Sequence, residues 1–502
     1  MKKTSHFLLI IQSIFCVSLL FIFFACSAPT PLNDNPALQE ITVNASFSGG
    51  SALLLLANPD SVEHSGFGLN ESARATGDIF EADKQILRIE NEIEQAPRSG
   101  YSAIDTFNRD GGGLLSSQSI ARSSGPLASG NTTMTTDPAW DTGTERGICP
   151  YTYGQPCEAA DKIDCTLRLK RSVSVGGESI TLYIWIADDW WSSTPETPTS
   201  NKIDNAELSA LADAFLPTSG EGIYHWVTDI TGQPWGTHPY GNVIAPDERL
   251  NIHIVVKDIS MANTVGYFWS MHNFLSSKVD GDTNQGLYFF LDSVFTDSDM
   301  DTSLSTLGHE FQHMVHYYQK VIARSVYSET WLNELASMAV EDLLADKIGV
   351  PGPRELPLDG GSYVYGSGSA SYSTADPYPS SRLSYFNTYP DRSIPYWSSG
   401  VDVMQDYAIS YTLGAYLMRA YSGPDLIKDL LQNGYGDQRA LTAITTAEGG
   451  AQDWGEILLD FAEAVVRSSN SAAEAKLRMN NGASGFSWTA AETDCTYDYQ
   501  LG

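Results

Sequence analysis

Two histidines four residues apart, with a glutamate directly after the first, occur in the stretch "TLGHEFQHMVHYY", residues 306–318. On an α-helix, residues i and i+4 project from one face about one turn apart. His309 and His313 can therefore offer two imidazole nitrogens to one metal ion, and neutral imidazole suits zinc. Zinc lowers the pKa of its bound water toward 7, and Glu310 is close enough to take the proton as that water attacks a carbonyl carbon.

A third metal ligand is predicted on the next helix, in the stretch "WLNELASMAVEDL". Glu334 follows His313 by 21 residues, which leaves room for a helix end, a loop and an antiparallel return helix. Trp331 and Met338 are its helical neighbours, so Glu334 lies on or at the edge of an apolar stripe. A buried carboxylate needs a partner, and a metal ion supplies one. The alternative is a surface glutamate, or one paired with Arg324.

Two further residues accompany the predicted ligands. Glu341 lies two turns beyond Glu334 and is either a reserve ligand or an acceptor that orients a ligand. His316 shares the stripe of His313 but lies a turn further from the metal, so we interpret it as a packing residue or a neighbour of the site. The alternative for the whole stretch is an ordinary packed helix, because apolar residues surround the histidines: Leu307, Phe311, Met314, Val315 and Tyr317.

The wording "GHEFQHMVHYYQK … ETWLNELASMAVED" resembles the gluzincin metallopeptidases and is most similar to the hyicolysin family. The resemblance covers roughly residues 180–430, and the strand "QGLYFFLDSVF" ahead of the first helix also matches the family layout. It implies a zinc endopeptidase in which His309, His313 and Glu334 are the metal ligands and Glu310 is the base.

The chain departs from the thermolysin-type pattern at one position. Those gluzincins carry an aspartate four residues after the ligand glutamate, where this chain has Met338. The carboxylate that braces His309 must therefore come from elsewhere, either from Glu341 or from an acid of "DSDMD" (297–301).

A peptidase also needs a donor for the oxyanion. The stretch "YTLGAYLMRAY" resembles the Tyr-x-x-Gly helix that follows the zinc site in several gluzincin families, which makes Tyr411 the candidate. Tyr407 is the alternative donor. A third possibility is that both tyrosines only pack in the core. The family layout implies that substrate binds extended along a sheet edge at residues 286–295.

The composition excludes one class of partner. The net charge is −32, whereas binding to nucleic acid requires clustered Lys and Arg that neutralise phosphates. We therefore expect a protein or peptide substrate and no nucleic acid.

The N-terminus predicts export. "MKK" is followed by an apolar stretch, residues 7–25, and then by Ala25 and Cys26 before a Pro- and Asn-rich segment. This layout resembles a bacterial lipoprotein signal, in which Cys26 is lipidated and anchors the protein to the membrane at the cell envelope. Phe23 and Phe24 depart from the usual residues, so a plain secretory signal and an uncleaved anchor stay open.

The other cysteines predict disulfides. Cys149, Cys157, Cys165 and Cys495 are an even number in a chain expected to be exported, which favours two bridges with three pairings open. A second metal, calcium, is a further hypothesis from the oxygen-rich turns "DGDTNQG" (280–286) and "DSDMD", although the EF-hand pattern is incomplete.

The pattern of apolar residues predicts an α+β protein. We expect a zincin-like metallopeptidase lobe, with a mixed sheet and two metal-binding helices, followed by a mainly helical C-terminal lobe. The expected regions are a signal peptide (1–25), a lipid-tethered region with a flexible linker that could be a pro-segment (26–147), the catalytic lobe (148–349), a Gly/Ser/Tyr-rich loop (350–400) and the helical lobe (401–502).

These observations together predict an exported zinc metalloendopeptidase. The rival hypothesis is a non-catalytic surface lipoprotein that binds an envelope or host component on a protease-like scaffold. A metal-dependent hydrolase acting on a non-peptide amide has the same ligand set and stays open.

Overall fold

The computed structural model describes residues 101–115, 140–350 and 403–466, apart from gaps at 153–155, 194–199 and 261–263, and isolated residues elsewhere. Nearly all of the predicted signal peptide and most of the predicted 350–400 loop lie outside the described residues. Cys26 and Cys495 lie outside them as well. In the described part of the chain, no helix combines the length and the apolar character needed to cross a bilayer.

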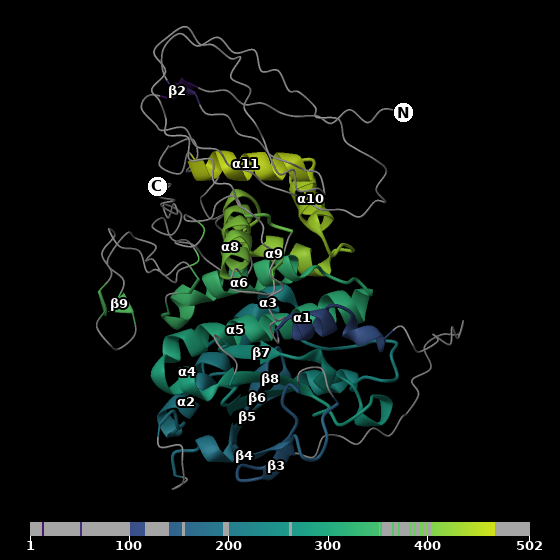
Figure 1. Ribbon diagram of the computed structural model, residues 1–502, viewed down its shortest axis with the longest axis vertical. Helices are drawn as coiled ribbons and strands as arrows, with labels where there is room; N and C mark the ends of the chain where they lie inside the picture. The colour runs from purple at the N-terminus through teal and green to yellow at the C-terminus, as the bar shows by residue number, and fades with distance from the viewer. Residues whose placement is uncertain are drawn as a thin grey trace, which may run out of the picture.

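A six-stranded mixed sheet forms the base of the molecule (Figure 1). Its first three strands are antiparallel, the next two join in parallel, and the short edge strand β7 runs antiparallel to its neighbour. The strands in spatial order are β3 (Glu145–Ile148), β4 (Ile163–Val175), β5 (Glu178–Ala187), β6 (Asn251–Lys257), β8 (Leu287–Asp292) and β7 (Gly266–Phe268).

The two central strands are buried on both faces, which is why they are continuously apolar rather than alternating. In β8, Leu287, Phe289 and Leu291 pack on the helical side, while Tyr288 and Phe290 pack on the other side. The expectation that residues 286–295 form a sheet edge is wrong. Strand β8 lies between β6 and β7, and the chain turns into a short helix, α4 (Ser293–Ser298), directly after Asp292.

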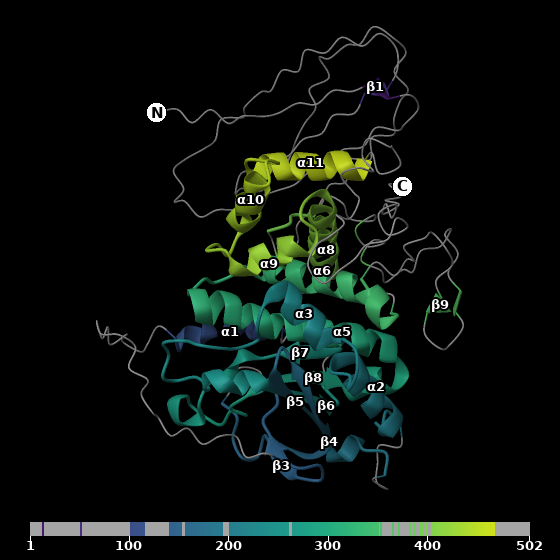
Figure 2. The same cartoon turned by 180° about the vertical axis from the view of Figure 1, so that it is seen from behind.

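Helices cover one face of the sheet in successive layers (Figures 1 and 2). The helix that carries the histidines, α5, packs on β7 and β8, and α6 packs on α5. A π-helical turn, Tyr317–Ile322, extends α5 beyond the histidines. Helix α5 spans Met300–His316 and α6 spans Thr330–Ile348. Further helices of the described residues are α2 (Asn205–Phe215), α3 (Ile223–Thr231), α8 (Val403–Ala420), α9 (Pro424–Gln432), α10 (Gln438–Ala447) and α11 (Trp454–Val466).

One helix, α1 (Tyr101–Asp110), stands where the sequence predicts a flexible linker. It packs against α6 and the π-helical turn. Ile104 is 3% exposed in the core cluster that contains Tyr267 and Trp269, and the ring of Phe107 contacts those of Trp269 and Phe274. Tertiary burial of two apolar residues three apart thus stabilises a helix whose glycine- and serine-rich surroundings favour a linker.

The cysteines agree with the prediction in part. Cys149 and Cys157 form a disulfide. Cys165 is a buried free thiol in β4, and its burial raises the thiol pKa. Any bridge to Cys495 falls outside the described residues.

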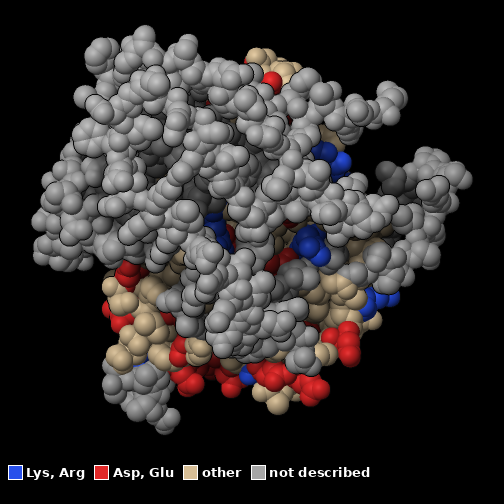
Figure 3. All heavy atoms as spheres, turned by 45° about the horizontal axis from the view of Figure 1, so that its top comes forward, with Lys and Arg blue, Asp and Glu red and all other residues tan. Residues whose placement is uncertain are grey.

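The acidic turns predicted to bind calcium have other partners. Asp282 forms an ion pair with Lys162 at 2.8 Å. The side chain of Asp299 caps the N-terminus of α5, accepting hydrogen bonds from the backbone N–H and hydroxyl of Thr302. No calcium site is supported at either turn. Asp and Glu side chains gather on the described part of the face shown in Figure 3, in keeping with the net charge of −32.

Candidate metal centre

The structure brings the three predicted ligands together. His309 and His313 project from α5, and Glu334 projects from α6. The two Nε2 atoms are 3.0 Å apart, and the carboxylate oxygens of Glu334 lie 3.2 Å from His309 Nε2 and 3.5 Å from His313 Nε2. Among the residues that the structure describes, this is the one grouping of three or more His, Cys, Asp or Glu donors with metal-binding spacing.

The donor set fits zinc. Ligands of a tetrahedral zinc ion at about 2.0–2.1 Å stand about 3.3 Å from one another. The three separations found here, 3.0 to 3.5 Å, bracket that value. Two imidazoles and one carboxylate leave a fourth position open, as catalytic zinc sites do.

Hydrogen bonds fix both imidazoles from behind. Nδ1 of His309 lies 2.5 Å from Oε1 of Glu341, and Nδ1 of His313 lies 3.0 Å from the hydroxyl of Ser337. With Nδ1 bonded on the far side, each Nε2 is directed to the metal position. Of the two alternatives for Glu341, the structure supports the acceptor that orients a ligand.

Glu310 lies where α5 meets the edge strand. Its carboxylate is buried and accepts a hydrogen bond from the backbone N–H of Phe268 in β7. Gly266 allows this approach, because a Cβ there would lie 2.7 Å from Thr306, 2.8 Å from the carbonyl of Phe290 and 3.2 Å from Glu310. Burial raises the pKa of Glu310, and the nearby histidines oppose the rise.

The charges of the three candidate ligands strongly affect one another's pKa values. Burial alone would lower the pKa of His309, but Glu341 and Glu334 raise it well above its usual range. The pKa of His313 is likewise raised, with Glu334 outweighing burial. Burial alone would raise the pKa of Glu334, but the two histidines lower it below its usual range. Glu334 is therefore an anionic carboxylate. It favours positive charge beside it, either protons on the histidines or a metal ion.

Two residues considered as neighbours or partners of the candidate ligands, His316 and Arg324, have hydrogen-bond partners of their own. His316 is buried, and its Nε2 lies 2.8 Å from the hydroxyl of Ser328, so it is a neighbour of the site and not a member of the ligand grouping. Arg324 donates to the backbone carbonyls of Gln319 and Gln432. It is therefore not the partner of Glu334.

Tyr411 hydrogen-bonds to a buried acid of α6 other than the candidate ligand. Its hydroxyl donates to the buried carboxylate of Asp342 at 2.9 Å. Asp342 is eight residues beyond Glu334 on α6, about 12 Å along the helix axis. The structure places Tyr407 in ring contact with Trp397, at 4.9 Å between centroids. The spacing of the "YTLGAYLMRAY" stretch resembles that of a helix with an oxyanion donor. This stretch belongs to α8, which packs on a different side of α6 from α5.

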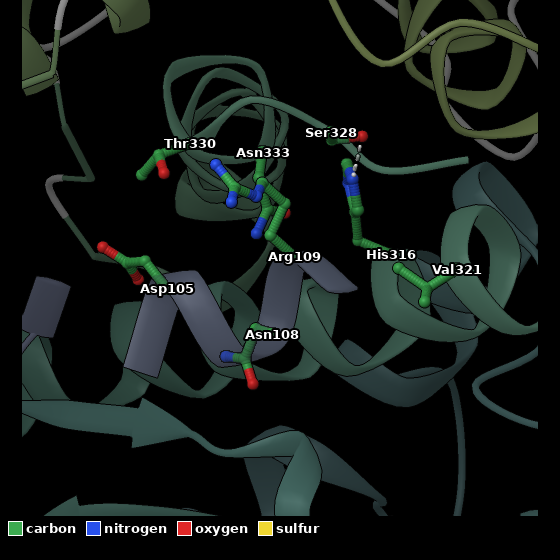
Figure 4. Close-up of a pocket in the computed structure, with 8 residues that line it drawn as sticks. All are labelled: Asp105, Asn108, Arg109, His316, Val321, Ser328, Thr330 and Asn333. Atoms are coloured by element: carbon green, nitrogen blue, oxygen red, sulfur yellow. Dashed lines mark hydrogen bonds between the residues drawn. The ribbon is translucent and has the colours of Figure 1, made fainter. Parts of the chain in front are cut away.

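Sequence reasoning missed a residue near this centre, Asp105 of α1. Burial raises the pKa of Asp105 to about 8, Glu334 adds to the rise, and His313 opposes it. Figure 4 shows Asp105 and Asn333 at a small cavity between α1 and α6. No local signal marks this residue, because Asp105 lies in a glycine- and serine-rich stretch that predicts a linker and not a helix.

The sequence profile of the peptidase M30 family matches residues 161–499, which is more than half of the chain. The chain belongs to the peptidase M30 family. The matched range contains His309, Glu310, His313 and Glu334, and the match confirms the resemblance to the hyicolysin family.

One curated protein similar to this M30 chain is the neutral metalloprotease ShpI of Staphylococcus hyicus. The two are 27% identical over 165 residues, which is 31% of this chain and 31% of that protein. The chain thus spans about a third of the length of the curated relative that it matches.

Two solved structures show a distant likeness. The M1 zinc metallopeptidase of Deinococcus radiodurans is 11% identical, with a TM-score of 0.29 over 64% of this chain and 60% of that chain. A mutant of a two-domain M1 zinc metallopeptidase bound to L-tryptophan is 10% identical, with a TM-score of 0.31 over 64% and 61%.

Proposed function

We propose that this M30 chain is an exported zinc-dependent metalloendopeptidase that hydrolyses peptide bonds in protein or peptide substrates. The observation that carries the proposal is the convergence of two Nε2 atoms and a carboxylate at 3.0–3.5 Å, with Glu310 beside them. Membership of a peptidase family supports the reaction class.

His309, His313 and Glu334 would hold the zinc ion. When bound, zinc polarises the scissile carbonyl and lowers the pKa of the attacking water. Glu341 and Ser337 keep the imidazoles in the required tautomer and orientation.

Glu310 acts as the base. Its carboxylate takes a proton from the attacking water and passes it to the departing amide nitrogen. Burial raises its pKa, which brings its proton affinity closer to neutral pH and makes both transfers easier. The hydrogen bond from the N–H of Phe268 holds this carboxylate at the edge of the sheet.

The substrate would bind in extended form along β7, the edge strand, rather than along β8. The backbone C=O of Phe268 accepts a hydrogen bond from a group outside the sheet, and the backbone N–H of Ser270 donates one to the same group. Those two groups are the pairing positions for an added strand. A substrate that pairs there has a peptide bond beside Glu310, because Phe268 hydrogen-bonds to Glu310 through its N–H and would bond to the substrate through its C=O.

Export is supported by the N-terminal sequence and by the disulfide between Cys149 and Cys157, since such bridges persist in oxidising compartments. We propose that Cys26 anchors the chain to the bacterial envelope, with secretion as the alternative. The helices from Val403 onward would form the second lobe of a zincin-like peptidase beside the catalytic one.

The test compares the purified wild-type chain with Glu310→Gln for zinc content and for hydrolysis of unfolded casein. We expect about one zinc per chain in both and cleavage only by the wild type. Glu145→Gln makes the same change at an exposed residue of β3 and should cleave like the wild type. A folded wild-type chain that binds no zinc would contradict the proposal.

A further inference from the structure

We infer that helix α1, Tyr101–Asp110, occupies the substrate side of the metal centre and slows the access of substrate to it. The inference rests on the proposed peptidase function, because it concerns the site where a peptide would bind. It concerns residues N-terminal to the part of the chain that matches the M30 family, residues 161–499.

Asn108 takes the hydrogen-bonding positions of a substrate. Its side-chain amide donates to the backbone C=O of Phe268 at 2.7 Å and accepts from the backbone N–H of Ser270 at 2.8 Å. A side-chain amide has the same donor and acceptor as a peptide bond, so Asn108 pairs with the edge of the sheet as an extended peptide would. No incoming peptide can make these two bonds while Asn108 makes them.

These bonds lie on the catalytic edge of β7. The N–H of Phe268 donates to Glu310, and its C=O accepts from Asn108. In an extended strand the N–H and C=O of one residue point to the same side. Asn108 therefore lies on the side of β7 that carries the proposed base.

Apolar contacts fix α1 in this position. Ile104 and Leu115 are 3% and 5% exposed, and they enter separate core clusters. The backbone C=O of Leu114 accepts a hydrogen bond from the side chain of Asn242 at 3.2 Å. The segment is thus anchored on both sides of Asn108, at Ile104 within α1 and at Leu114 and Leu115 after it.

A second polar residue of α1 lines a small cavity beside the start of α6. Figure 4 shows Asp105 projecting from α1 toward Thr330, at the start of α6, whereas Asn108 points toward the sheet. The charges of His309, His313, Glu310 and Glu334 all act on the Asp105 carboxyl.

The experiment uses the purified full chain and the double variant Asp105→Ala, Asn108→Ala. Two rates are measured: cleavage of a fluorogenic peptide, and withdrawal of zinc by the chelator dipicolinate, which needs access but no catalysis. Both rates should rise at least about tenfold in the variant, because the two hydrogen bonds by which Asn108 holds α1 on β7 are lost. Asn205→Ala, the same truncation at the exposed start of α2, should leave both rates unchanged.

A second measurement distinguishes the release of α1 from a folding defect of the variant. A synthetic peptide of residues 101–115, added to the double variant, should slow both rates toward the wild-type values. Equal rates in the wild type and a folded double variant would overturn the inference. Faster zinc withdrawal without cleavage by either chain would support the position of α1 and contradict the proposed peptidase function.

Discussion

Nδ1 of His309 lies 2.5 Å from Oε1 of Glu341, two helical turns along α6 from the ligand Glu334. Residues seven apart on an α-helix differ by only about 20° around its axis, so Glu334 and Glu341 share one face of α6. One helix thereby supplies both a ligand and the brace for another ligand. A second oxygen of Glu341 accepts from the hydroxyl of Ser305 at 2.6 Å, which fixes the carboxylate in turn.

Replacement of Glu341 should weaken metal binding without removing a ligand. We expect Glu341→Gln to lower the affinity for zinc about 10- to 100-fold, because the amide keeps the shape but loses the charge that supports His309. Competition with a chromogenic chelator measures this affinity. Glu448→Gln alters an exposed glutamate far along the chain and should bind zinc like the wild type. An unchanged affinity in Glu341→Gln would show that the contact is not needed.

The metal-free chain should lose stability as the pH rises from about 6.5 to beyond 8. The pKa of His309 and that of His313 are raised above the unfolded value of 6.5, so their stabilising contribution is complete below 6.5 and is lost as the pH passes the folded values. Asp105 acts in the same direction, because its pKa rises from 3.8 to about 8.

Thermal unfolding of chelator-treated protein between pH 6 and pH 9 measures this loss. The zinc-loaded protein is the control, since bound metal takes the place of the protons and should flatten the curve. A metal-free protein whose melting temperature is constant over this range would contradict the predicted coupling.

The centre of the site could be predicted from the sequence because its signals are local. His309, Glu310 and His313 occupy one helix, and the apolar stripe around Glu334 marks it as buried. Strand β8 was predicted for the same reason, since its apolar run is long enough to stand out.

The parts that were missed depend on tertiary contacts. Strand β7 is three residues long, and only its pairing with β8 and its contact with α5 define it. Without β7 the sheet edge was assigned to β8, the strand beside it. Helix α1 has the same explanation, since Ile104 is buried and Phe107 is half-buried by residues far away in the sequence. The partner of Tyr411 depends on how α8 crosses α6, which no local pattern determines.

Gly266 should not tolerate a side chain. A Cβ in Gly266→Ala would lie 2.8 Å from the backbone carbonyl of Phe290, so β7 must shift away from α5 and the hydrogen bond to Glu310 must lengthen. We expect the free energy of unfolding to fall by about 1–3 kcal/mol and the rate of peptide cleavage to fall with it. Gly241→Ala adds the same methyl group where nothing lies within 4 Å, and chemical denaturation should show it near wild-type stability. Equal stabilities for the two variants would contradict the close approach of β7.

Tyr411→Phe separates a structural role from a catalytic one. The variant removes the hydrogen bond to Asp342 and leaves a buried carboxylate without that donor, so the free energy of unfolding should fall by about 1–3 kcal/mol. If the bond to Asp342 is the role of Tyr411, the kcat for peptide cleavage should stay within about twofold of the wild-type value, whereas loss of an oxyanion donor costs about 100- to 1,000-fold. Denaturant unfolding and steady-state kinetics on the same preparation measure both quantities, with Tyr407→Phe as the matched tyrosine control. A loss of kcat on the 100-fold scale, with stability unchanged, would restore Tyr411 as the oxyanion donor and require α8 to move toward the metal centre during catalysis.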